Sequence, residues 1–223
     1  MHFHENLHVR LWVSENSTNE ETVQILKENG IKYIRNPGAT HSEGMNQLFN
    51  LCETEFALLL DTDIIFTRPI QPYLDFMKIE ELTLFGEYQQ DRAKKKLHPR
   101  IAPWFCLVNM TNLRRFNIPF NDTAKMLKNN LTAEIKYDVG STMFEEATKH
   151  GLRANDIGPE KRYIHYEGMS WHTNKYSMIE SNIDAGGTHS DKNLYKLGES
   201  KLKIYLEKEV EKFKDVSIMN QFN

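Results

Sequence analysis

Two aspartates, Asp61 and Asp63, directly follow the apolar run Phe56–Leu60, with Thr62 between them. A continuous apolar run of this length is typical of a central parallel strand that is covered on both faces. Carboxylate oxygens are hard ligands that suit Mg²⁺ or Mn²⁺, and a strand end holds them rigidly. A divalent cation held there stabilises the charge on a departing diphosphate. The alternative is a turn in which the aspartates cap backbone amides.

The segments before this motif alternate between strand and helix. We expect a strand at Val9–Val13, a helix over 18–29 and a second strand at Ile31–Ile34. Apolar residues at helical spacing then predict a helix over 42–52, capped by Ser42. Such alternation predicts an α/β domain with a central mixed, mostly parallel sheet flanked by helices.

In an α/β sheet, ligands collect at the carboxyl ends of the strands. Two polar clusters, residues 14–17 and 61–63, both follow predicted strands, so we expect them at one binding site. The rest of the chain is less regular. Its predicted elements are strands at 82–85, 104–108 and 161–166 and helices at 139–150 and 194–213.

Composition restricts the classes of function. The chain has 223 residues, of which 26% are charged, and a formal net charge of −3. This balance argues against a protein built mainly to coat nucleic acid or anionic membrane. No apolar run approaches the roughly 18 residues that suggest a membrane span, and the first residues lack signal-peptide architecture. We therefore expect a cytoplasmic protein with no nucleic-acid partner and no membrane span.

Three segments resemble the family 2 glycosyltransferases, in the order in which that family places them. Leu11–Thr22 is similar to the family's nucleoside-binding segment, and Leu58–Ile65 matches its metal-binding strand end. Tyr137–Phe144 is similar to the segment that supplies the catalytic carboxylate. Only eight residues precede Val9, so the family's N-terminal strand is expected to be shortened or missing.

The resemblance implies a single domain, 1–223, of the Rossmann-like GT-A fold. Residues 9–70 would bind nucleotide and metal, 71–171 would bind the acceptor and carry out catalysis, and 172–223 would form a flap and a C-terminal helix. It implies a metal-dependent enzyme of glycan biosynthesis. Such an enzyme moves a sugar, with inversion, from a nucleoside diphosphate sugar (often UDP-linked) to a hydroxyl of a glycan or another acceptor. Mn²⁺ or Mg²⁺ would be the cofactor.

Residue by residue, the resemblance implies that Asp63 is the direct metal ligand. Asp61 would be a second ligand or would contact ribose and metal-bound water, and Thr62 would lie in the same donor site. Glu15, with Asn16 beside it, would accept a hydrogen bond from the nucleobase, and Asp138 would be the general base. Two alternatives remain: Asp138 as the N-cap of its helix, and Glu15 as a solvated turn residue.

His165 begins the segment His-Tyr-Glu-Gly, which is similar to the metal-ligand histidine segment near the end of other GT-A enzymes, including retaining ones. Transfer with retention is therefore the alternative to inversion. A nitrogen ligand suits Mn²⁺ better than Mg²⁺, although a lone histidine is more often structural. Residues 172–190 have the composition of a mobile flap, from which His172 and Lys175 would approach the diphosphate. Lys94–Lys96, with Arg92 and Arg100, close over the diphosphate, receive an anionic acceptor or form a solvated charged loop.

Two other classes of function compete with a transferase. A haloacid-dehalogenase-like phosphohydrolase would use Asp61 as its nucleophile, but that class places the motif on the first strand and needs a downstream acidic pair. A non-catalytic nucleotide- or glycan-binding module could keep the fold and the metal without turnover. Nucleotidyltransferases share the architecture but need a Gly-rich phosphate loop near the N-terminus, which the sequence lacks.

Overall fold

The computed structural model describes residues 9–16, 20–61, 64–90 and 96–165. The chain divides into two compact units, Met1–Tyr166 and Glu167–Asn223, and the described residues all belong to the first. The predicted flap at 172–190 and the predicted helix at 194–213 lie outside the described residues, as does the predicted start of the first helix near Thr18.

The first unit begins with a strand–helix–strand unit. Strands β1 (Trp12–Glu15) and β2 (Lys32–Arg35) pair in parallel, and helix α1 (Glu20–Glu28) connects them. The parallel pairing follows from the helical crossover, because two strands joined by a helix run in the same direction. The carboxyl ends of β1 and β2 therefore lie side by side, which places Glu15 next to Arg35 in the register.

Helix α2 (His41–Leu51) begins with a capping box. The Thr40 hydroxyl accepts the amide of Glu43, and the Glu43 carboxylate accepts the amide of Thr40 at 2.7 Å. The prediction that Ser42 caps this helix was wrong, because only Thr40 has a glutamate three residues later that can reach back to its amide.

The main sheet has the strand order β3-β6-β5-β7, with β3 at Phe56–Leu60, β5 at Leu84–Gln89, β6 at Arg100–Asn109 and β7 at Ala154–Asp156. Strand β6 runs antiparallel to both β3 and β5, whereas β5 and β7 are parallel. The mixed sheet is confirmed, but the prediction that β3 is a parallel strand was wrong. No helix separates β5 from β6 in the described residues, so the chain can return as a hairpin.

A second, two-stranded sheet lies after Asp61. Strand β4 (Ile64–Phe66) pairs antiparallel with β8 (Tyr163–His165), and Ile64 faces His165 in the register. The strand predicted at 161–166 is thus confirmed as β8. Strand β4 joins the residues just after the aspartate motif to the last described residues of the chain.

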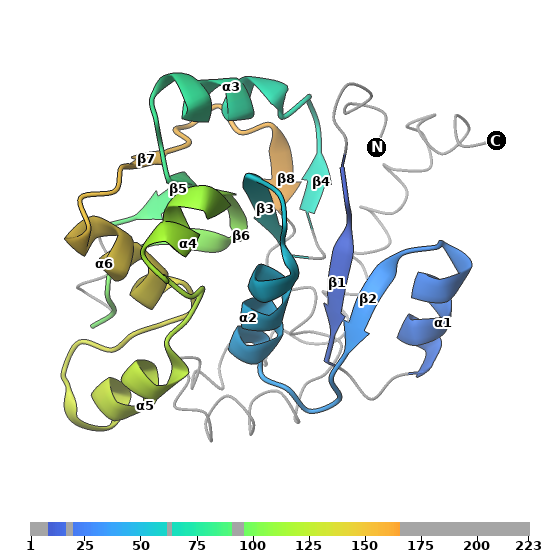
Figure 1. Ribbon diagram of the computed structural model, residues 1–223, viewed down its shortest axis with the longest axis horizontal. Helices are drawn as coiled ribbons and strands as arrows, with labels where there is room; N and C mark the ends of the chain where they lie inside the picture. Colours follow the sequence, from blue (N-terminus) through green and yellow to red (C-terminus); the bar gives the residue numbers. More distant parts are fainter. Residues whose placement is uncertain (1–8, 17–19, 62–63, 91–95, 166–223) are drawn as a thin grey trace, which may run out of the picture. The chain divides into compact units, whose positions relative to one another are not determined.

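Helices cover the main sheet on both faces (Figure 1). One core cluster packs α2, α4 (Met110–Arg115) and α6 (Ser141–Lys149) on the sheet, and the other packs α3 (Gln71–Ile79) on the opposite face. Neighbours along β6 alternate between the clusters, with Cys106 in the first and Phe105 in the second. A mixed α/β fold with flanking helices is confirmed. No helix of the described residues is long and apolar enough to cross a membrane.

Candidate functional site

Asp61 lies directly beyond the carboxyl end of β3. Its amide donates to the carbonyl oxygen of Trp104 at 3.1 Å, which extends the pairing of β3 with β6 by one residue. This bond fixes the backbone of Asp61 relative to the sheet. Thr62 and Asp63 lie outside the described residues. Among the residues that the structure describes, no three His, Cys, Asp or Glu side chains form a metal-binding group.

Trp104 connects Asp61 to His165. While the Trp104 carbonyl accepts the Asp61 amide, its indole ring stacks on the imidazole of His165, with 5.3 Å between centroids and 25° between planes. His165 is paired through the backbone with Ile64, the residue that follows Asp63 in the sequence. The structure therefore brings His165 to the segment that carries the aspartate motif.

Glu87 of β5 binds strand β8, which carries His165, and the residues just before it. The Glu87 carboxylate accepts the hydroxyl of Tyr163 and pairs with the Lys161 ammonium at 2.8 Å. Burial raises the pKa of Glu87, but the hydrogen bonds from Lys161 and Tyr163 outweigh it and leave the pKa below its ordinary value. The ring of Tyr163 also stacks on Phe105 of β6, at 4.0 Å between centroids. These contacts fix the position of His165 relative to Trp104.

Asp138 forms a buried ion pair with Arg100. The Arg100 Nη1 lies 3.1 Å from Asp138 Oδ2, and the two side chains are only 7% and 10% exposed. Arg100 also donates to Gln89 Oε1 at 2.8 Å and to the carbonyl of Val139 at 2.6 Å. Its guanidinium lies 5.5 Å from the centroid of the Trp104 ring. The interpretation of Arg100 as part of a solvated loop was wrong, because it is the first residue of β6 and is buried.

Asp138 is not the N-cap of the helix that follows it. Helix α6 begins at Ser141, and its cap residue is Gly140, which has φ 81° and no side-chain cap. Asp138 Oδ1 instead accepts the amide of its neighbour Val139 at 2.8 Å. The carboxylate is thus placed by Arg100 and by its own turn, and the alternative role as a helix cap is excluded.

His41, in the first turn of α2, belongs to the same electrostatic environment. Desolvation lowers its pKa, the negative charges of Asp61 and Asp138 oppose that shift, and the positive charge of Arg100 adds to it. The His41 residue itself is exposed. The ring packs edge-on against the buried Phe120, with 6.3 Å between centroids.

The sequence analysis did not select His41. A usable signal was present, because the segment 36–41 follows the carboxyl end of β2. The rule that selected residues 14–17 and 61–63 applies equally to this third strand end. Arg100 carried no comparable signal, because only the tertiary structure shows that it is buried beside Asp138.

Glu15 and Asn16 lie at the carboxyl end of β1. Glu15 is 4% exposed, so its interpretation as a solvated turn residue was wrong. Asn16 donates to the carbonyl of Thr40 at 3.3 Å and accepts the hydroxyl of Ser14 at 2.7 Å. A Cβ atom on Gly44 would lie 2.3 Å from the Ser14 hydroxyl oxygen, so glycine permits this close approach of α2 to β1. Asn16 thereby holds the start of α2, with His41, beside Glu15.

The remaining predicted site residues cannot be placed. His172, Lys175 and the basic residues Lys94 and Lys95 lie outside the described residues, together with Thr62 and Asp63. Of the site residues predicted from the sequence, the structure describes Glu15, Asn16, Asp61, Asp138 and His165.

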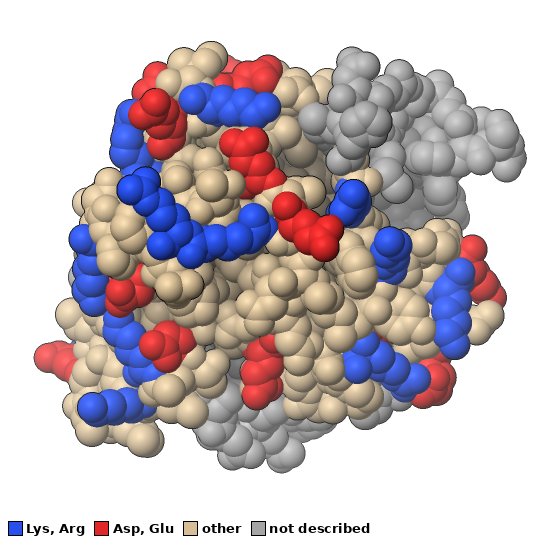
Figure 2. Space-filling model, in the orientation of Figure 1, with Lys and Arg blue, Asp and Glu red and all other residues tan. Residues whose placement is uncertain are grey.

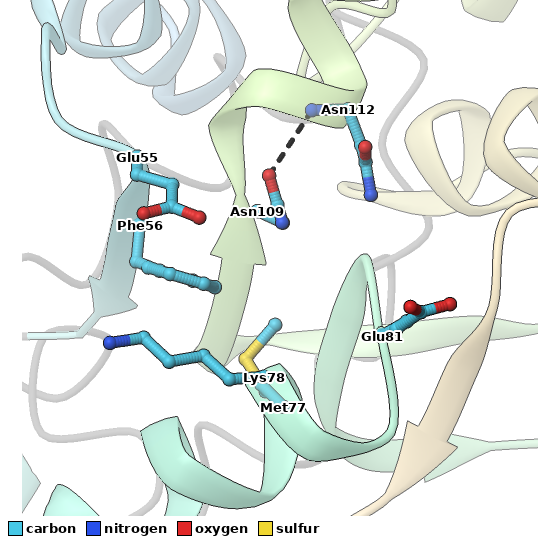
Figure 3. Close-up of a pocket in the computed structure, with 7 residues that line it drawn as sticks. All are labelled: Glu55, Phe56, Met77, Lys78, Glu81, Asn109 and Asn112. Atoms are coloured by element: carbon cyan, nitrogen blue, oxygen red, sulfur yellow. Dashed lines mark hydrogen bonds between the residues drawn. The ribbon is translucent and has the colours of Figure 1, made fainter.

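A shallow pocket of about 410 Å³ lies at the other end of β3 (Figure 3). Phe56, the first residue of β3, lines it, with Asn109 paired opposite on β6. The pocket therefore lies away from Asp61, and none of the predicted site residues lines it. Its other lining residues are Glu55, Met77, Lys78, Glu81 and Asn112.

Figure 2 shows Lys and Arg side chains interspersed with Asp and Glu over the visible described surface, without a continuous basic face. A nucleic-acid-coating protein needs such a face to neutralise phosphates.

No protein-family model matches the chain, and no curated protein matches it. Among solved structures, a mannosyltransferase from Pyrobaculum calidifontis in complex with GDP-Man and Mn²⁺ is 12% identical, with a TM-score of 0.46 over 72% of this chain and 50% of that one. A protein of STIV is 11% identical, with a TM-score of 0.40 over 70% of this chain and 84% of that one. The chain thus spans half the length of the mannosyltransferase.

A putative glucose-1-phosphate thymidylyltransferase from Bacillus anthracis, in complex with a sucrose, is 10% identical to the chain. Its TM-score is 0.43 over 78% of this chain and 74% of that one. At these identities and TM-scores the comparisons establish no family for the chain.

Proposed function

We propose that the chain is a metal-dependent glycosyltransferase of the GT-A fold. It moves a sugar from a nucleoside diphosphate sugar, in the first instance a UDP-sugar, to an acceptor hydroxyl with inversion. The observation that carries this proposal is the gathering of three chemically distinct groups around Trp104. They are the Asp61 backbone, the His165 imidazole and the Arg100–Asp138 pair.

In this proposal, Asp61, Asp63 and His165 form the site for a divalent cation. His165 is paired with Ile64, which directly follows Asp63 in the sequence, and Asp61 is three residues before Ile64. Two carboxylates and one imidazole form a mixed oxygen and nitrogen ligand set that suits Mn²⁺. Asp61, Asp63 and His165 would hold the ion, which when bound would neutralise charge on the departing diphosphate.

In this proposal, Asp138 acts as the general base. Its Oδ2 pairs with Arg100 and its Oδ1 accepts the Val139 amide, but a carboxylate offers about four lone-pair sites and can accept a further hydrogen bond. In the transfer step, the acceptor hydroxyl gives its proton to Asp138, and its oxygen forms a bond to the anomeric carbon. The bond from that carbon to the diphosphate oxygen breaks, and the nucleoside diphosphate leaves with the electron pair.

Arg100 acts as a positioning residue in this proposal. Its guanidinium joins Asp138, the Val139 carbonyl and Gln89, which links the base to the ends of β5 and β6. A base held in this way needs little reorganisation when the acceptor arrives.

The buried Glu15 supports a nucleoside subsite at the end of β1. A buried carboxylate at a strand end can accept a ring N–H of a nucleobase, and Asn16 binds the adjoining start of α2. His172, Lys175 and Thr62 belong to the proposal as further donor contacts on the strength of the sequence resemblance alone.

Metal-dependent nucleotide binding tests the proposal. UDP, GDP and TDP are added to the full chain with Mn²⁺ or with EDTA, and thermal unfolding is followed. A ligand at 100 times its Kd stabilises the native state by about 2.7 kcal/mol, so at least one nucleotide should raise the Tm with Mn²⁺ and much less with EDTA.

Matched variants make the binding test specific. Asp61→Asn and Asp63→Asn should lose the metal-dependent shift, whereas Glu55→Gln, at the opposite end of β3, should keep it. If no nucleoside diphosphate gives a metal-dependent shift, or if Glu55→Gln abolishes it equally, the proposed donor site is wrong.

The reaction products distinguish the proposed transferase from the two alternative functions. A phosphohydrolase would release phosphate from phosphomonoesters and form an aspartyl-phosphate at Asp61, which the transferase never does. A binding module would show the metal-dependent shift without turnover of any UDP-, GDP- or TDP-sugar. Slow hydrolysis of one donor sugar with Mn²⁺ would support the transferase against both.

A further inference from the structure

Helix α5 (Thr123–Thr132) exposes its apolar face to solvent. None of its residues is buried. Leu131 is 85% exposed, Leu127 is 43% exposed, and Ile135, just beyond the helix, is 47% exposed. Leu127 and Leu131 are four residues apart and therefore lie on the same helix face. A surface helix of a globular protein normally turns such a face to the core, so this apolar ridge needs another explanation.

Polar side chains attach α5 to the rest of the unit. Asn130 donates to the carbonyl of Tyr137 at 2.9 Å and accepts its amide at 2.8 Å. Asn129 donates to the carbonyl of Ile135 at 2.9 Å, and Lys125 contacts Glu145 and Glu146 of α6. The helix is therefore held by its polar face, and the ridge is presented in a fixed orientation.

The charges beside the ridge are mainly positive. Lys128 follows Leu127, and Lys136 follows Ile135, and both lysines are exposed. The nearby acidic residue Glu134 forms an ion pair with Lys96 at 3.0 Å. The ridge is thus flanked by positive charge although the whole chain carries −3.

We propose that the ridge formed by Leu127, Leu131 and Ile135 docks on the surface of an anionic phospholipid bilayer. Exposed leucines beside exposed lysines on a surface helix are features of a helix that lies in the membrane interface. The apolar side chains enter the headgroup region while Lys128 and Lys136 contact anionic headgroups. This inference goes beyond the proposed transferase activity and does not depend on it.

Docking has a geometric consequence for the loop that carries Asp138. Asn130 binds both backbone groups of Tyr137, and Asp138 is the next residue. A bilayer that contacts α5 therefore lies near the loop of the proposed base.

Co-sedimentation with lipid vesicles tests the proposal. The full chain is mixed with vesicles of phosphatidylcholine alone or of phosphatidylcholine with phosphatidylglycerol, at low and high salt. We expect binding to the anionic vesicles that weakens with salt. Failure to bind either kind of vesicle would overturn the proposal.

Three variants locate the binding surface. The double variant Leu127→Ser with Leu131→Ser should lower the partition coefficient by about tenfold or more, because two apolar side chains no longer leave water. Lys128→Glu should weaken binding to anionic vesicles only. Ile79→Ser is the matched control, since Ile79 is 77% exposed but lies at the end of α3. Equal loss in Ile79→Ser, or unchanged binding in the double variant, would contradict the proposal.

A second copy of the chain is the alternative occupant of the ridge. Size-exclusion chromatography with light scattering should give the same mass for the native chain and for the double variant over a range of concentrations. A concentration-dependent dimer that disappears in the double variant would show that the ridge binds a second copy of the chain, and the bilayer proposal would be wrong. Circular dichroism of each variant shows that the fold is retained.

Discussion

Two ionic clusters lie on either side of the segment that leads into α6, and they differ in burial and in composition. The Arg100–Asp138 pair is buried, with side chains 7% and 10% exposed. Lys125 instead pairs with both Glu145 and Glu146 of α6, and these carboxylates are 28% and 30% exposed. The first cluster joins a loop to the main sheet, whereas the second joins two helices at the surface.

The difference decides what each cluster can do. A buried pair gains little net stability from being formed, but removal of one partner leaves an uncompensated charge in a desolvated place. A surface network exchanges its partners with water at little cost. The buried pair is therefore the place where the structure fixes one carboxylate, and the surface network adds only modest stability to α5 and α6.

The largest expected effect is on turnover. Asp138→Asn should lower donor-sugar transfer by about 10²–10⁴-fold, the usual effect of removing a positioned base. Glu145→Gln removes a carboxylate from the surface network and should leave turnover within a few-fold of the native chain. Both are assayed at a temperature at which circular dichroism shows them folded. Near-normal turnover in a folded Asp138→Asn protein would contradict the catalytic role of the buried pair and show that Asp138 is a structural residue.

The next effect is on the free energy of unfolding. Arg100→Met and Asp138→Asn should each lower it by about 3–5 kcal/mol, because each leaves one buried member of the pair without its counter-charge. The double variant should lose less than the sum of the two, since neither charge then remains. Urea unfolding of the four proteins measures this coupling. Strictly additive losses would mean that the two side chains do not stabilise each other.

The smallest effect belongs to the surface network. Glu145→Gln should lower the free energy of unfolding by less than about 1 kcal/mol at pH 7. Burial raises the pKa of Glu145, but hydrogen bonds from Lys125, Tyr137 and Lys149 dominate and lower it from 4.5 to about 2. A lowered pKa means that the stabilisation is present above pH 4.5 and is lost as the pH falls from 4.5 towards 2. The native chain and Glu145→Gln should thus converge in stability over this range.

The local pattern of the sequence predicted the elements that depend on neighbouring residues. The apolar run Phe56–Leu60 is β3, and the segment expected at 139–150 contains α6. The sequence also predicted where these two acidic residues lie along their strands, because Glu15 and Asp61 are found at strand ends. These features depend on periodicity and on strand length, which a single sequence displays.

Features that depend on distant residues did not follow from the sequence. The direction of β6 is set by its two neighbours β3 and β5, and no local pattern encodes it. Arg100 looks like a surface cation until Asp138 is brought beside it. The sequence analysis did not predict helix α5. Its apolar residues face solvent and its hydrogen-bonded asparagines face the protein. Helix prediction expects the reverse, with the apolar face turned to the core.

The pairing of β3 with β6 also has a consequence for the order in which the chain folds. Leu60 pairs with Phe105, and Ile64 pairs with His165, so both strands that border the aspartate motif find their partners far along the chain. Contacts between distant positions form slowly, because a long loop must close before they contribute. During synthesis, β3 remains without its partner until the ribosome has released residues beyond Asn109. Over that interval the apolar face of Phe56–Leu60 is exposed, which makes this nascent segment the place where misfolding and chaperone binding would begin.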